Sequence, residues 1–88
     1  MAFNKTKIYR QYYALIYRLD DSYPMRQMIG EAAILFRSKN AEVIRQKLST
    51  KHKGQQIKML AIGNDYSLPK REAKKFGINL LDLGKTLE

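Results

Sequence analysis

The stretch that most constrains the fold is residues 37–62, in which a helical pattern ends at a glycine turn and an apolar strand pattern begins. Ser38 can accept a backbone N–H bond as an N-cap for a helix over about residues 39–49. Three apolar residues then share one side of that helix: Ala41, Ile44 and Leu48. Gly54 supplies the freedom at positive φ that a reversal of direction requires, and residues 56–62 fit a largely buried strand. The sequence therefore predicts a helix packed on a strand.

Composition favours one small folded domain. The chain has 88 residues, so we expect residues 1–88 to form a single domain that buries only about 60 to 65% of the surface exposed by its unfolded form. Hydrophobic residues make up 44% of the chain, which is too apolar for a disordered tail. We expect a mobile basic arm over residues 1–7, a core of sheet and helix over 8–62, and a pair of helices over 67–88.

Charge points to a polyanionic partner. The net charge is +9 and the isoelectric point is about 9.9. Nucleic acid is the usual partner of so basic a small domain, and an anionic membrane is the weaker alternative. The chain has no cysteine, and we find neither a long apolar span nor a secretory signal pattern. We therefore expect a cytoplasmic protein that does not enter a membrane.

Residues 8–19 fit both a strand and a helix, and aromatic enrichment favours the strand. A strand would alternate tyrosines with Arg10 and Arg18, which is typical of a surface on which bases stack while guanidinium groups hold phosphates. The other interpretation, which we favour, is that the tyrosines are buried with their hydroxyls at the rim. The RNA-recognition signature of Gly and aromatic residues is absent from the sequence.

An α/β (α+β) fold follows from the order of these patterns. Asp20 to Pro24 reads as a turn, and a second strand is expected over 32–36. We predict an antiparallel sheet of about three strands (8–19, 32–36 and 56–62) covered by the central helix. Eight residues should contribute to the core: Leu15, Ile16, Ile34, Phe36, Ile44, Leu48, Ile57 and Met59.

Two short helices are predicted after the loop at residues 63–66. The first opens at Ser67-Leu68-Pro69 and ends at Gly77, with Ile78 folding back onto the last turn as a Schellman motif requires. Asn79 would cap the second helix, with Asp82 three residues on. The apolar residues of that second helix include Leu83 and Leu87.

Residues 69–87 resemble a helix-turn-helix. In that family a small residue of the first helix stands four positions before the turn glycine, with apolar residues beside the glycine and within the second helix. Five residues occupy those places here: Ala73, Phe76, Gly77, Ile78 and Leu83. The resemblance implies DNA docking, but Leu80, Leu81 and Asp82 stand where the family places polar readers of bases. Two short helices that pack on the sheet or on a partner are the other interpretation.

Residues 32–62 are similar, in the order of elements and in the Lys53-Gly54 turn, to small histone-like DNA-binding proteins of some bacteriophages and to small ribosomal proteins. The first resemblance implies a DNA-binding accessory or regulatory protein of a phage or mobile element. The second implies an RNA-binding ribosomal or ribonucleoprotein component.

The leading functional hypothesis is a non-enzymatic nucleic-acid-binding protein that contacts phosphates, with DNA favoured over RNA. Thirteen residues are candidate contacts: Arg10, Arg18, Arg37, Lys39, Arg45, Lys47, Lys51, His52, Lys53, Lys70, Arg71, Lys74 and Lys75. One or two of the charges at residues 51–53 could instead complement the carbonyls of the helix end, but this does not explain the whole cluster.

A protein-interaction module is the alternative, namely an inhibitor or assembly factor that binds an acidic partner or a second copy of the chain. Its apolar contacts would be Leu80, Leu81, Leu83 and Leu87. We expect no enzyme, cofactor or metal site, because the sequence lacks a glycine-rich phosphate loop and His52 is its one histidine, set among lysines.

Overall fold

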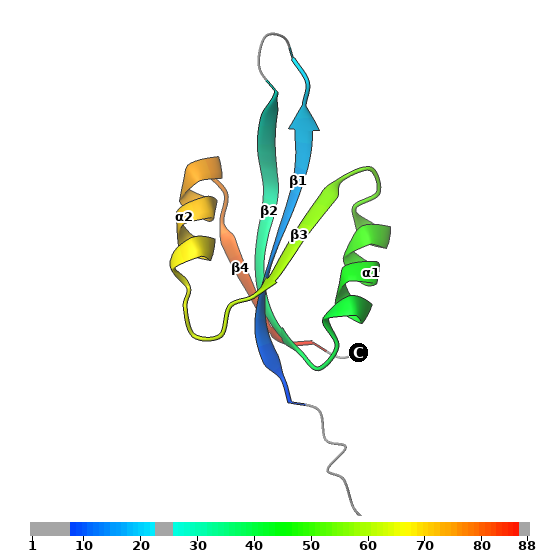
Figure 1. Ribbon diagram of the computed structural model, residues 1–88, viewed down its shortest axis with the longest axis vertical. Helices are drawn as coiled ribbons and strands as arrows, with labels where there is room; N and C mark the ends of the chain where they lie inside the picture. Colours follow the sequence, from blue (N-terminus) through cyan, green and yellow to red (C-terminus); the bar gives the residue numbers. More distant parts are fainter. Residues whose placement is uncertain (1–7, 23–25, 87–88) are drawn as a thin grey trace, which may run out of the picture.

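The computed structural model describes residues 8–22 and 26–86. The predicted basic arm at residues 1–7, the last two residues of the predicted turn (23–24) and Leu87 lie outside the described residues. Six elements follow one another along the chain (Figure 1): β1 (Arg10–Asp20), β2 (Gln27–Ser38), α1 (Ala41–Lys51), β3 (Gln56–Ala61), α2 (Ser67–Phe76) and β4 (Leu80–Lys85). None of the described helices is long and apolar enough to cross a membrane.

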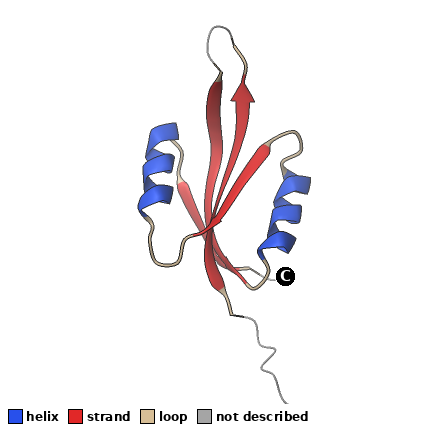
Figure 2. Ribbon diagram, in the orientation of Figure 1, coloured by secondary structure: helices blue, strands red, loops and turns tan. Residues whose placement is uncertain are grey.

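The four strands form one mixed sheet in the order β3-β1-β2-β4. β1 pairs antiparallel with both β2 and β3, and β4 pairs parallel with β2. The predicted α+β class is confirmed, and strands form at the three predicted places. The predicted antiparallel sheet of three strands is wrong, because a fourth strand, β4, pairs parallel with the open edge of β2. Two parallel-strand crossovers result, β2-α1-β3 and β3-α2-β4, and they run in opposite directions across the sheet. Since such crossovers are right-handed, their helices must lie on opposite faces, as Figure 2 shows.

The sheet consequently has a core on each face. On the α1 side, Ala14, Ile16, Ile34 and Phe36 are buried together with Ile44 of the helix. On the α2 side, Tyr13, Leu15, Ala33 and Leu35 are buried together with Ala73. Neighbouring strand residues point to opposite faces, so the central stretches of β1 and β2 are buried without interruption. Of the eight predicted core residues, five are buried and three are partly buried: Leu48, Ile57 and Met59.

The predicted cap of α1 is wrong by two residues. Ser38 pairs with Arg10 in the sheet, is fully buried and belongs to β2. The helix begins at Ala41, and Asn40 is its N-cap, because its Oδ1 accepts a hydrogen bond from the backbone N–H of Glu42 at 3.2 Å. Ser38 Oγ instead accepts the N–H of Asn40 at 3.0 Å. The ladder between β1 and β2 therefore continues through the residue that the local pattern assigned to the helix.

The predicted second C-terminal helix is also wrong, because Leu80–Lys85 is strand β4. β2 offers it an unpaired edge, against which Leu80 lies opposite Ala33 and Asp82 lies opposite Leu35. Asp82 does not complete a capping box, since its Oδ1 accepts the N–H of Gly84 at 2.8 Å. Gly84 has a φ of 66°, at the irregularity in the β2–β4 register. The helix-turn-helix resemblance therefore ends at the turn.

The turn itself forms as predicted. Gly77 adopts the left-handed conformation with a φ of 65°, and the N–H of Ile78 donates to the carbonyl of Ala73 at 3.0 Å. This is the Schellman pattern, in which the residue after the glycine returns to the preceding turn. Ile78 also packs against the core on the α2 side. Helix α2 is therefore stopped at a defined residue and directed into β4.

Candidate nucleic-acid interface

Helix α2 separates apolar and cationic residues on opposite sides. Pro69 and Ala73 are buried against the sheet, and Phe76 packs on the same core. Four exposed cations, hereafter the α2 cations, lie on the other side: Lys70, Arg71, Lys74 and Lys75. At about 100° per residue, these four positions span an arc of about 140°. The predicted basic face of this helix is thus one exposed surface, at whose edge Nζ of Lys75 lies 5.4 Å from the ring centroid of Phe76.

The acidic residue of α2, Glu72, points inward. Its Oε1 accepts a hydrogen bond from the hydroxyl of Tyr13 at 2.8 Å, and its Oε2 lies 2.7 Å from Nζ of Lys58. Tyr13 is fully buried, and the Glu72 side chain is only 16% exposed. The negative charge of Glu72 is therefore held beneath the helix rather than among the α2 cations.

The ionisation of this network fits a structural role. Burial acts to raise the pKa of Glu72, but hydrogen bonds from Lys58 and Tyr13 and the positive charges of Lys58 and Lys75 outweigh it and lower the pKa. Burial, followed by the hydrogen bond to Glu72, raises the pKa of Tyr13. Glu72 is therefore an anion and Tyr13 is a neutral donor at neutral pH.

The predicted contacts around α1 form a second basic surface. Arg45 and Lys47 lie within the helix, and Arg45 lies 3.9 Å from the carboxylate of Glu42. Lys39 precedes the helix and lies at the end of the sheet beside Tyr9. Lys51 and Lys53, hereafter the turn lysines, are exposed and make no ion pair with any residue in 8–22 or 26–86.

His52 is tied into the turn between them. Its Nδ1 lies 3.0 Å from Oε1 of Gln55, and its backbone N–H caps the helix through the carbonyl of Leu48 at 2.8 Å. Gly54, with a φ of 81°, reverses the chain as predicted.

The two basic surfaces do not join. Helices α1 and α2 cover opposite faces of the sheet, as the separate cores beneath them show (Figure 1). A straight duplex lying along α2 therefore faces away from the turn lysines.

The tyrosines of β1 that the sequence offers for base stacking are mostly covered. Tyr12 stacks on Phe36 with ring centroids 5.5 Å apart, and Tyr13 lies under α2. Arg18 lies near the β1–β2 hairpin and is paired with Glu31 at 3.3 Å. Arg10 is exposed at the opposite end of β1. The favoured interpretation was that the tyrosines are buried. The structure confirms it for the middle of β1.

A basic cluster that the sequence did not predict forms at the end of the sheet. Nζ of Lys39 lies 5.2 Å from the ring centroid of Tyr9, and Nζ of Lys85 lies 4.8 Å from it. Arg37 is opposite Lys85 in the β2–β4 ladder. We call Tyr9, Arg37, Lys39 and Lys85 the sheet-end cluster. No local pattern points to Lys85, because its segment fits a helix and its neighbours in the cluster are 46 or more residues away.

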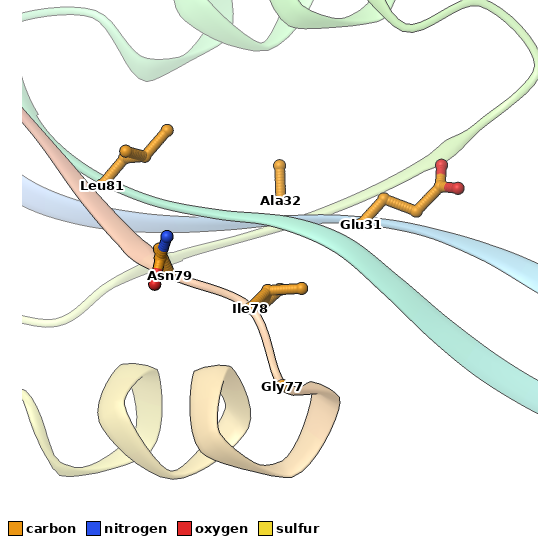
Figure 3. A pocket seen from close by; sticks show the side chains of 6 residues that line it. All are labelled: Glu31, Ala32, Gly77, Ile78, Asn79 and Leu81. Carbon is orange, nitrogen blue, oxygen red and sulfur yellow. The ribbon is translucent and has the colours of Figure 1, made fainter.

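An open depression of about 370 Å³ lies between β2 and the connection from α2 to β4. Figure 3 shows Ala32 and Leu81 pointing toward the side of α1, with Glu31 farther along β2. The polar side chains in its lining are those of Glu31 and Asn79. Within residues 8–22 and 26–86, no group of three or more His, Asp or Glu side chains is placed to hold a metal ion. The depression offers no nucleophile with an adjacent base.

No protein family, curated protein or solved structure matches this chain.

Proposed function

We propose that this protein is a small, non-enzymatic nucleic-acid-binding protein whose helix α2 contacts the phosphate backbone. The observation that carries the proposal is the charge separation within α2. The α2 cations face solvent, while Tyr13 and Lys58 hold Glu72 beneath the helix. A surface of this kind attracts a row of phosphates, and pairing with Lys58 weakens the repulsion from Glu72.

Double-stranded DNA is the favoured ligand. The α2 cations are lysines and an arginine, which bind phosphates readily, and the helix has no exposed Asn or Gln that would read bases. The major groove of B-DNA admits a helix with cationic flanks, whereas that of A-form RNA is too deep and narrow for side chains to read. The proposed binding is therefore largely independent of sequence.

The turn lysines supply a second contact surface in this proposal. They lie on the other side of the sheet, so they would contact a different segment of nucleic acid from the one along α2. Arg45 and Lys47 belong to helix α1, on the same side of the sheet as the turn lysines.

A salt titration tests the proposal. Each neutralised phosphate contributes about −0.9 to the slope of log affinity against log salt concentration on duplex DNA. Four to six contacts should therefore give a slope of roughly −3 to −5. Affinity should change little between duplexes of unrelated sequence. Absent or salt-insensitive binding to duplex DNA, with the protein folded, contradicts the proposal.

A protein-interaction module is the second candidate, and one observation favours it. Leu81 and Leu83 are 52% and 53% exposed on β4, at the edge of the sheet. Leu80 is partly buried in the core on the α2 side and therefore exposes less apolar surface to a partner. Replacing Leu81 and Leu83 with alanine distinguishes the two candidates. If the protein binds DNA through α2, its DNA affinity should not change. If the protein is an interaction module, the same variant should lose binding to an acidic protein or to a second copy of the chain.

A further inference from the structure

The sheet-end cluster combines an aromatic ring with three cations at the end of the sheet. Tyr9 directly precedes β1, four residues before Tyr13, which faces α2. Arg37 lies two residues beyond Leu35, which also faces α2, and Lys85 is opposite Arg37. In Figure 1 the first residues of β1 lie beyond α2, toward the end of the molecule where β4 finishes. The cluster thus continues the α2 face past the end of the helix.

Tyr9 differs from the other tyrosines in its surroundings. The other four tyrosines in the described part of the chain pack into the two cores: Tyr12, Tyr13, Tyr17 and Tyr66. Tyr9 precedes β1, belongs to neither core and keeps part of its surface exposed. Its ring contacts are the ammonium groups of Lys39 and Lys85. The ring is therefore held at the surface among cations and is not needed to fill the interior.

A stacked base binds an aromatic ring more strongly than an ammonium group does, which favours replacement of a lysine by a base at Tyr9. An ammonium group over an exposed aromatic ring contributes about a two- to fivefold factor to an equilibrium constant. A nucleic-acid base stacked on a protein ring contributes about 5- to 150-fold. A base can therefore replace an ammonium group at Tyr9, and the displaced group remains close enough to approach the phosphate of the same nucleotide. A duplex gains nothing at this ring, because its bases already stack on one another.

We propose that the sheet-end cluster binds an unpaired nucleotide, with its base stacked on Tyr9 and its phosphates near Arg37, Lys39 and Lys85. This inference rests on the proposed function. Because α2 lies on the same face, the substrate class is DNA in which a duplex continues into a single strand. The duplex lies along the α2 cations and the unpaired strand reaches the end of the sheet.

The test compares three labelled DNA ligands by fluorescence anisotropy: a blunt duplex, the same duplex with a thymidine overhang, and the same duplex with an abasic overhang of equal length. The variants are Tyr9→Leu, which removes the ring, and Tyr9→Phe, which keeps it. Neither variant changes the charge of the protein. Thermal unfolding checks that both are folded.

Tyr9→Leu should weaken binding to the thymidine overhang about 5- to 150-fold and leave blunt-duplex affinity within about twofold. Tyr9→Phe should bind as the wild type does, and the abasic overhang should show no difference between wild type and Tyr9→Leu. If the wild type binds blunt duplex but Tyr9→Leu retains full affinity for the thymidine overhang, the inference is wrong and the proposed function stands. If the wild type binds none of the three ligands, both are wrong.

Discussion

The hydroxyl of Tyr13 donates a hydrogen bond to the carboxylate of Glu72 at 2.8 Å, and this bond joins the central strand β1 to the middle of α2. Lys58 of β3 approaches the other carboxylate oxygen at 2.7 Å. Three elements distant in sequence therefore meet at one anion. The same contacts stabilise the position of α2 and leave its outer side to the cations.

The first prediction concerns acid stability. The pKa of Glu72 is lowered in the folded state below its ordinary value of 4.5, so its stabilising contribution is present above that value and is lost as the pH falls through the folded-state pKa. Denaturant unfolding of the wild type should show this loss. Glu72→Gln should reduce the free energy of unfolding by about 1 to 3 kcal/mol at neutral pH, because Lys58 loses its counter-charge. The difference between the two proteins should shrink in acid, and a constant difference would contradict the assigned role.

A second prediction concerns the close contact between β2 and α2. A Cβ added at Gly30 would lie 2.6 Å from Cγ and Cδ2 of Phe76, near the base of that side chain. Gly30→Ala should therefore lower the free energy of unfolding by about 1 to 3 kcal/mol through overpacking.

A double-mutant cycle gives the control for Gly30→Ala. In a Phe76→Ala background the two ring atoms at 2.6 Å are gone and only the Cβ of residue 76, at 3.2 Å, remains close, so the same substitution should cost less. Equal costs in the two backgrounds would show that Phe76 is not the obstacle.

A third prediction separates the two basic surfaces. Lys51 and Lys53 are replaced together with alanine. On a duplex short enough to contact only the α2 face, the slope of log affinity against log salt concentration should not change. On long DNA, which can reach both sides of one molecule, the slope should flatten by up to about two units. Stability should change by less than about 0.5 kcal/mol, because both side chains are exposed. A flattened slope on the short duplex would place the turn lysines in the same contact as α2.

The sequence predicted the features that local residues determine. The left-handed Gly77 with the return of Ile78 to Ala73, the turn at Gly54 and the three strands were all indicated by short patterns, and all are confirmed. The sequence predicted one helix on one face of the sheet, whereas the structure has a helix on each face. Uninterrupted burial of residues 13–16 and 33–36 requires a second helix on the other face.

The missed features depend on contacts between distant residues. The local pattern around Leu80 and Leu81 fits either a helix or a strand. Pairing with the open edge of β2 stabilises the strand. Ser38 is a good N-cap residue, but its place in the ladder opposite Arg10 makes it part of β2. The sheet-end cluster was missed for the same reason, because Tyr9 and Lys85 meet only through the sheet. The cations of α2 were predicted because helical spacing alone groups them.

The measurement that tests the central claim most directly is the salt slope of a variant in which the α2 cations are replaced together by glutamine. These side chains are exposed and Glu72 keeps its contacts with Tyr13 and Lys58, so the variant should fold. A variant with Arg26, an exposed residue beside the hairpin, replaced by glutamine controls for lost charge away from α2. On a short duplex, the account predicts that the slope moves toward zero by about three to four units with the first variant and by less than about one unit with the control. A folded α2 variant that keeps the wild-type slope would contradict the claim that α2 contacts the phosphate backbone.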